Sequence, residues 1–260
     1  MMKSYLGLSI FLILSACSSH RRFLSPFESE VDGLHLYNAS WIDPQEKKLL
    51  RSMEPYEPEH FQELKDLGVT DVLIFKDSKD GALGSEYEKL KSVGISASNI
   101  HNIPFKWKDI ENFREACEQT LQGLRLMRDI AEQKSKRLLL HCTVGEDRTG
   151  YLTGLYTLMQ DPTQDIATVF QEEMCENGYS SGNPEKPIEK VALPIDQNLT
   201  PLFIKMSFQI KTSKLTRKNI DSNLCATEPA QSAKFIQFRN ALEPKLFCKP
   251  STRYKPGIRS

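Results

Sequence analysis

The 260-residue sequence has no apolar run long enough to cross a membrane as a helix, no cluster of residues with metal-ligand spacing and no glycine-rich loop of the nucleotide-binding kind. The apolar run near its beginning, residues 5–14, falls well short of the roughly 20 residues that a spanning helix needs. The chain also has no net charge, since 34 lysine and arginine residues face 34 aspartate and glutamate residues. We expect no metal, no organic cofactor and no nucleic-acid partner, and the oligomeric state stays open.

The hydrophobic residues that are present, 39% of the chain, suffice for a real core. We expect a signal segment (1–16), a short polar tether (17–30), one main domain (31–178) and a C-terminal extension (179–260). The extension is basic: residues 181–260 hold 14 basic and 6 acidic residues, so this part carries +8 and the rest of the chain −8. Such an excess can attract anionic substrates or lipid head groups, although a solvated face is the simpler interpretation.

The beginning of the chain resembles a bacterial lipoprotein signal. Lys3 precedes the apolar run, and Leu14-Ser15-Ala16-Cys17 is similar to the lipobox at which such signals are cut. The resemblance implies cleavage before Cys17 and acylation of Cys17, which would anchor the chain to a membrane. Ser18 in the next position implies the outer membrane of the bacterial cell envelope, with the protein facing the periplasm. The alternative is an ordinary secretory signal with an incidental cysteine, and either signal takes the mature chain out of the cytoplasm.

Apolar periodicity predicts strands that alternate with helices in the main domain. Strand patterns occupy residues 31–37, 69–75, 99–105 and 137–141, and helical patterns occupy residues 58–67, 85–93, 110–131 and 165–175. This alternation predicts an α/β fold with a mostly parallel central sheet flanked by helices. Beyond a linker-like break at 181–187, two further helical patterns (199–210 and 233–242) predict a mostly helical extension.

The strand pattern at 137–141 leads into the most informative stretch of the chain. Cys142 follows that strand directly, Gly145 lies in the loop after it, and a helical pattern begins just after Thr149. In a strand, loop and helix of this kind, backbone N–H groups converge on one point above the positive end of the helix. The loop would therefore bind a phosphate-sized dianion and would favour the thiolate form of Cys142.

The same stretch resembles the signature of the protein tyrosine phosphatase superfamily, which reads His-Cys, five residues, Arg, Ser or Thr, and Gly. Here it reads His141-Cys142, residues 143–147, then Arg148-Thr149-Gly150. The order of elements is similar to the compact dual-specificity branch of that superfamily over residues 31–177. The resemblance implies a phosphoric monoester hydrolase in which Cys142 is the nucleophile, Arg148 grips phosphate oxygens and Thr149 stabilises the departing thiolate. It also implies that His141 orders the loop and that phosphate is bound by Thr143, Val144, Gly145, Glu146, Asp147 and Arg148.

Two aspartates compete for the role of general acid. Asp109, in Lys106-Trp107-Lys108-Asp109, is similar in position to the acid of the family's Trp-Pro-Asp loop, although Lys108 replaces the proline. Asp109 also suits the N-cap of a helix beginning at Ile110, and the two roles are compatible. Asp147 is the alternative acid, because loops of the Gly-x-Asp-Arg-Thr type occur in a lipid- and inositide-directed branch, although that branch usually has Lys where this chain has Glu146. Asp147 could equally hold the loop shape through backbone hydrogen bonds, and we expect Glu146 to point outwards, away from the anion.

Lysines near the loop indicate the class of substrate. Lys106 and Lys108 flank the expected acid, and Lys76 and Lys79 follow a strand expected to end at the same rim, so a multiply phosphorylated ligand is plausible, although surface lysines are usually just solvated. The expected place outside the cytoplasm tips the choice slightly towards a small phosphoester such as an inositol polyphosphate. A phosphotyrosine or dual-specificity protein substrate ranks almost level. An inactive lipoprotein that binds a phosphorylated ligand, and a sulfur transferase of the rhodanese kind, are further alternatives.

Four cysteines besides Cys17 and Cys142 are available for disulfides in an oxidising compartment. Cys225 and Cys248 bracket the last predicted helix and are the preferred pair. Cys117 falls on the apolar face of a predicted helix, which favours a buried thiol, although three full pairings of the four cysteines are possible.

Overall fold

A computed structural model describes residues 27–77, 82–108, 110–181 and 190–249 of the chain. It contains a five-stranded sheet in the order β1-β2-β5-β3-β4, in which only the edge strand β1 runs antiparallel to its neighbour. The predicted α/β fold with a mostly parallel sheet is confirmed. The strands are β1 (Ser40–Trp41), β2 (Leu49–Ser52), β3 (Asp71–Ile74), β4 (Ile100–Asn102) and β5 (Leu138–His141).

One strand prediction is wrong. The alternating residues 31–37 form turns and irregular backbone, and the edge of the sheet is formed by β1 and β2 instead. Val31, Leu34 and Leu36 are nevertheless buried, because they pack in the smaller of two apolar clusters. The alternation of apolar residues therefore correctly indicated that one side of this segment is buried, but it did not indicate whether the segment pairs with a strand.

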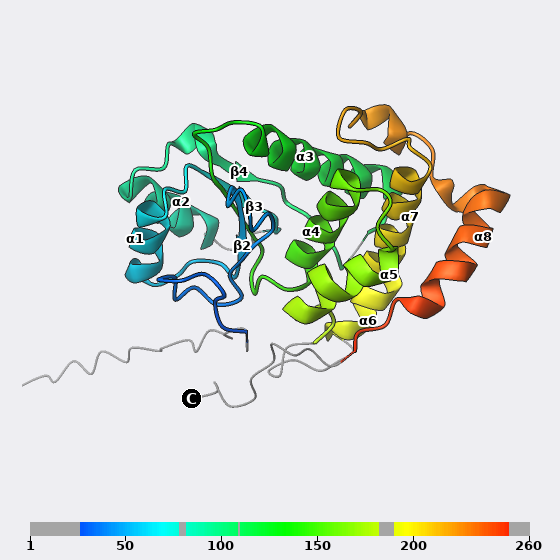
Figure 1. Ribbon diagram of the computed structural model, residues 1–260, viewed down its shortest axis with the longest axis horizontal. Helices are drawn as coiled ribbons and strands as arrows, with labels where there is room; N and C mark the ends of the chain where they lie inside the picture. The colour runs from blue at the N-terminus through cyan, green and yellow to red at the C-terminus, as the bar shows by residue number, and fades with distance from the viewer. Residues whose placement is uncertain (1–26, 78–81, 109, 182–189, 250–260) are drawn as a thin grey trace, which may run out of the picture.

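Helices cover both faces of the sheet (Figure 1). Alternate residues of β5 point to opposite faces, with Leu139 in the smaller cluster and Leu138 and Leu140 in the larger one. The smaller cluster lies against α1 (Pro58–Asp66) and α2 (Ala82–Ser92). The larger one lies against α3 (Phe113–Ala131), α4 (Asp147–Gln160) and α5 (Ile166–Val169), which continues as a π-helical turn, Phe170–Met174.

The extension beyond residue 190 is mostly helical and shares the larger cluster with the sheet. Figure 1 shows α7 beside α4 and α8 outside α7. Phe203 of α7 makes edge contacts with Tyr151 of α4 and packs near Phe170, with ring centroids 6.4 and 5.6 Å apart. The helices of this part are α6 (Ala192–Pro194), a π-helical turn (Ile195–Leu199), α7 (Thr200–Lys211) and α8 (Ala233–Leu242). No helix in the described ranges is both long and apolar enough to span a membrane.

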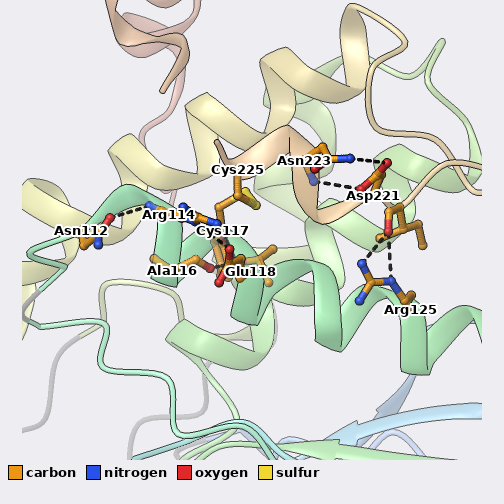
Figure 2. Close-up of a disulfide and its surroundings, with 12 residues drawn as sticks. Asn112, Arg114, Ala116, Cys117, Glu118, Arg125, Asp221, Asn223 and Cys225 are labelled. Carbon is orange, nitrogen blue, oxygen red and sulfur yellow. Dashed lines mark hydrogen bonds and ion pairs between the residues drawn. A yellow bond between two sulfur atoms is a disulfide. The ribbon is translucent and has the colours of Figure 1, made fainter. Parts of the chain in front are cut away.

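The disulfides differ from the predicted pair. Cys117 is bonded to Cys225 and Cys175 to Cys248, so Cys225 and Cys248 do not pair with each other, and Cys117 is not a buried free thiol. Figure 2 shows Cys117 on α3 facing Cys225 in the short turn Ser222–Cys225, close to the bond that Arg125 donates to the carbonyl of Ile220. Both bonds join the extension to the sheet-bearing part of the chain. The sequence could not reveal this pairing. It shows which cysteines flank a helix, but it does not show which part of the chain that helix packs against.

The bond between Cys117 and Cys225 should contribute strongly to stability, since it spans 108 residues. We expect the double change Cys117→Ser and Cys225→Ser to lower the free energy of unfolding by about 3–5 kcal/mol, because loop closure no longer limits the unfolded chain. Guanidinium unfolding followed by circular dichroism measures this. The matched control is Cys142→Ser, which leaves both disulfides in place. An unchanged midpoint in the double variant would contradict the bond.

Candidate active site

The candidate nucleophile lies at the carboxyl end of the central strand. Cys142 follows β5 directly, is 1% exposed and is the free cysteine of the described residues. The chain then turns through residues 143–146, and α4 begins at Asp147, three residues before the predicted start just after Thr149. Strand, loop and helix are thus arranged as the sequence predicts, with the loop above the N-terminus of a fourteen-residue helix.

Gly145 allows the loop to lie against the neighbouring strand. Its φ is +74°, and a Cβ there would lie 2.5 Å from the carbonyl carbon of Ser52 and 2.6 Å from the backbone nitrogen of Met53. No other residue type fits both the dihedral angle and the contact. The glycine therefore fixes the distance between the loop and the end of β2.

Two buried side chains bind the carbonyl oxygen of Gly145. Arg51 of β2 donates to it from one guanidinium nitrogen at 2.8 Å and to the carbonyl of Glu173 from the other, and Asn38 donates to it at 3.1 Å. Arg51 is 1% exposed and Asn38 fully buried. Because both side chains bind this carbonyl oxygen, they fix the orientation of the loop backbone at Gly145. Sequence reasoning missed both residues, and no local signal marks them, since the strand Leu49–Ser52 reads Leu-Leu-Arg-Ser and has only two apolar residues.

The surroundings of Cys142 favour its thiolate. Burial alone would raise the pKa of the thiol, but the guanidinium of Arg148 and the hydroxyl and N–H of Thr149 outweigh it, so that the pKa lies below its usual value. Arg148 donates to the hydroxyl of Thr143 at 3.0 Å, which places the guanidinium across the loop. The structure therefore brings together the predicted Cys142, Arg148 and Thr149.

Asp147 is buried at the first position of α4. Its Oδ1 accepts the N–H of Ser180 at 3.0 Å. Burial raises the pKa of Asp147 to about 6, although the N–H of Ser180 and the cations Arg148 and Lys108 oppose the shift. The carboxylate also acts on Cys142, whose pKa it raises. Asp147 thus combines a hydrogen bond that shapes the loop with a pKa suited to proton transfer near neutral pH.

Glu146 does not point outwards as predicted. It is 2% exposed and packs against Gly178, where a Cβ would lie 2.8 Å from Cγ of Glu146. Gly178 has a φ of +89°, so this close approach also depends on glycine. The side chain is buried because the turn at Gly178 packs against it.

Asp109, the predicted general acid, lies outside the described residues, as does Lys79. The N-cap alternative for Asp109 is wrong, since α3 begins at Phe113 and its cap is Asn112, whose side chain accepts the N–H of Arg114. Of the predicted substrate rim, Lys106 and Lys108 are exposed. Lys108 is held by the extension: its ammonium group donates to the carbonyl of Lys190 at 3.0 Å, and its carbonyl accepts the side chain of Asn198 at 2.9 Å.

Lys76 is not at the substrate rim. It is 4% exposed and lies between the carboxylates of Glu54 and Glu86, at 2.7 and 3.1 Å. The prediction failed because it treated a lysine after a strand as solvated, whereas α2 covers this one. In the described ranges, no group of three or more histidine, cysteine, aspartate or glutamate side chains is placed to hold a metal ion.

The fold and this loop define a class of protein, the cysteine-dependent phosphoric monoester hydrolases with a Cys-x5-Arg anion loop. The model of the tyrosine phosphatase family matches residues 33–170, and the chain belongs to that family. The match covers the sheet, the loop and α4, and it ends before the extension. The chain is a phosphoric monoester hydrolase of the protein tyrosine phosphatase type.

Several solved structures are similar to the chain at low identity. A putative phosphatase from Shewanella putrefaciens CN-32 is 21% identical, with 67% of this chain and 94% of that one covered and a TM-score of 0.43. TpbA of P. aeruginosa is 18% identical (70% and 97% covered, TM-score 0.43), and the core catalytic domain of the PP-IP phosphatase SIW14 from S. cerevisiae is 23% identical (52% and 73% covered, TM-score 0.40). A comparison with curated protein sequences found no match. The family match, and not these distant likenesses, assigns the chain.

Proposed function

We propose that this protein is a lipid-anchored, extracytoplasmic phosphatase that hydrolyses phosphomonoesters through a phosphocysteine intermediate, with inositol polyphosphates as its favoured substrates. The observation that carries the proposal is the loop at the end of β5. A buried thiol with a lowered pKa, a guanidinium across the loop and a helix N-terminus converge there on one site for a dianion.

The reaction proceeds in two displacements. The Cys142 thiolate attacks phosphorus, an S–P bond forms, and the P–O bond to the alcohol breaks. Arg148 and the loop N–H groups stabilise the charge on the phosphoryl oxygens, and a carboxylic acid protonates the departing alcohol. Water then attacks phosphorus and gives its proton to the same carboxylate. The S–P bond breaks, phosphate leaves, and the Thr149 hydroxyl stabilises the returning thiolate.

We assign the general acid to Asp147 among the described residues. Its pKa of about 6 keeps it protonated in mildly acidic solution, and it lies close enough to Cys142 and Arg148 to shift the pKa of the thiol and to have its own pKa lowered by the guanidinium. An ordinary aspartic acid would already be ionised at that pH. Asp109 is the competing assignment, and the loop that leads to it is held by Asn198 and Lys190 of the extension.

The proposed location rests on the lipoprotein-like N-terminus, which lies outside the described residues, and on the two disulfides. Disulfides persist in oxidising compartments and are rare in most cytosolic proteins, so Cys117–Cys225 and Cys175–Cys248 favour a place outside the cytoplasm. Mass spectrometry of the mature N-terminus tests the anchor. A chain that is not cleaved before Cys17, or that carries an unmodified Cys17, would contradict it.

The proposed substrate class rests on location and on the rim. Phosphotyrosyl proteins are scarce outside the cytoplasm, and the exposed Lys106 and Lys108 would meet additional phosphates of a polyphosphorylated ring. The description of the matching family instead favours phosphotyrosine, which is the second candidate.

Phosphate release by the mature chain without added metal distinguishes these candidates. We expect inositol hexakisphosphate to be hydrolysed with a kcat/KM at least about tenfold above that of a phosphotyrosine peptide, because the rim cations bind phosphates that the peptide lacks. The control is Lys106→Met, which should reduce the ratio while leaving hydrolysis of p-nitrophenyl phosphate unchanged. A higher kcat/KM for the peptide would support the second candidate. Release from none of the three would favour a binding lipoprotein.

A further inference from the structure

A chain of four buried ionisable side chains lies directly behind the candidate nucleophile. Glu54 follows β2, Lys76 follows β3, Glu86 lies on α2 and His141 ends β5. Their exposed fractions are 8%, 4%, 3% and 0%. The Nζ of Lys76 lies 2.7 Å from Oε2 of Glu54 and 3.1 Å from Oε2 of Glu86. Oε1 of Glu86 lies 2.8 Å from Nε2 of His141.

The two ring nitrogens of His141 both face acceptors. Nδ1 forms a hydrogen bond of 2.9 Å with the carbonyl oxygen of Cys142, and Nε2 lies 2.8 Å from Oε1 of Glu86, an ion-pair contact that is not aligned as a hydrogen bond. A carbonyl oxygen only accepts, and Glu86 is kept ionised by the ammonium group of Lys76 on its other oxygen. A hydrogen on each ring nitrogen is the arrangement that suits both contacts. A neutral imidazole has only one N–H and would leave a lone pair facing one of these oxygens.

The charge balance of the cluster leads to the same result. Two carboxylates and one ammonium group would leave a net negative charge in a site shielded from water, and an imidazolium cancels it. Burial alone would lower the pKa of His141, but the Glu86 carboxylate outweighs burial and raises it. The pKa of Glu86 is lowered, because His141 and Lys76 outweigh the effect of its own burial.

We propose that Glu86 is a positioning residue: it holds His141 as an imidazolium and so maintains the bond from His141 to the Cys142 carbonyl, through which His141 is expected to order the loop around the thiolate. The inference rests on the proposed role of Cys142. As a charged donor, the imidazolium binds the carbonyl more strongly than a neutral ring would. With that carbonyl turned towards His141, the following N–H groups of the loop are free to face the anion. Glu54 braces the same loop, since its N–H donates to the carbonyl of Thr143.

The charge state of His141 is measured directly by nuclear magnetic resonance of ¹⁵N-labelled histidine, with the signal assigned by its loss in His141→Gln. We expect both ring nitrogens of the wild-type protein to be protonated at pH 7, where an ordinary histidine is mostly neutral. In Glu86→Gln we expect the ring to become neutral at least one pH unit lower than in the wild type. A wild-type ring that is neutral at pH 7 would overturn the proposal, and this arm needs no variant of Glu86 to fold.

The second arm measures the thiol without any substrate. We expect alkylation of Cys142 by iodoacetamide at pH 6 to be several-fold slower in Glu86→Gln, because a rise of one unit in the pKa of the thiol lowers the thiolate fraction by up to about tenfold. The matched control is Asp71→Asn, at the opposite end of β3. Asp71 is also a buried carboxylate between a lysine and a histidine, Lys136 at 2.9 Å and His101 at 3.6 Å. Equal rates in Glu86→Gln and the wild type, or equal slowing by Asp71→Asn, would overturn the role of Glu86. Because alkylation requires no phosphate ester, this result stands apart from whether the proposed substrate is correct.

Discussion

Replacing Cys142 with serine should abolish phosphate release, with a loss in kcat on the order of 10⁴-fold or more. In the proposed mechanism the sulfur is the nucleophile, because Arg148 and Thr149 lower the pKa of the thiol in a buried site. A serine hydroxyl has a far higher pKa, and these groups cannot bring it into the working range. The oxygen nevertheless fits the space of the sulfur, so the cradle formed by the loop and Arg148 should still bind phosphate.

The measurement pairs turnover of p-nitrophenyl phosphate with binding of inorganic phosphate by calorimetry. We expect Cys142→Ser to bind phosphate with a Kd within a few-fold of the wild type and to keep its unfolding midpoint. Arg148→Met is the matched comparison, since it should lose both turnover and phosphate binding. If Cys142→Ser kept more than about 1% of wild-type turnover, covalent catalysis by this residue would be excluded.

The parts of the site that lie at fixed offsets along one stretch could be predicted from sequence. Cys142, Arg148 and Thr149 depend on a strand, a tight loop and a helix in immediate succession, so their relative positions are local and the structure reproduces them. The strand at Asp71–Ile74 was also predictable, because a buried parallel strand is a continuous apolar run. In these places local propensity and the tertiary fold agree.

The residues that support the loop could not be predicted, because each reaches it from a distant part of the chain. Arg51 lies 94 residues from Gly145 and breaks the apolar pattern of β2, which hid that strand as well. Lys76 resembles a surface lysine until α2 covers it with Glu86. The pairing of Cys117 with Cys225 depends on where the extension packs on α3, which no local pattern reveals. Supporting interactions of this kind follow from tertiary packing.

Replacing each of the two candidate acids with asparagine should show which of them donates the proton. We expect Asp147→Asn to lower kcat by about 10²–10⁴-fold, because the departing alcohol then leaves without a proton. Asp147 has a pKa of about 6, so wild-type kcat should fall as the pH rises above that value. The variant should lose this decline and keep the decline at low pH that comes from the thiol. A pH profile of kcat for an alkyl phosphomonoester, whose departing alcohol needs the proton, measures both.

The pH dependence of the free energy of unfolding is an independent test of Asp147. The pKa of Asp147 is about 6 in the folded chain and 3.8 in the reference state, so ionisation destabilises the fold. The penalty is absent below pH 3.8, grows between pH 3.8 and 6, and reaches roughly 2–3 kcal/mol above pH 6. Asparagine avoids ionisation and can still accept the N–H of Ser180. We therefore expect Asp147→Asn to be more stable than the wild type at pH 7 and no more stable at pH 3.5.

Asp109→Asn is the matched variant, measured on the same substrate over the same pH range. If Asp147 is the acid, Asp109→Asn should change kcat by less than about tenfold and keep the decline above pH 6. If the loss of kcat and of that decline belongs to Asp109→Asn instead, Asp109 is the acid, as the loop Lys106-Trp107-Lys108-Asp109 predicts. Asp147 would then keep its bond to Ser180 as a support of the loop. An aspartate that lowers stability at pH 7 and is also required for turnover belongs to the catalytic site. We expect only one of the two aspartates to show both the gain in stability and the loss of kcat when it is replaced by asparagine.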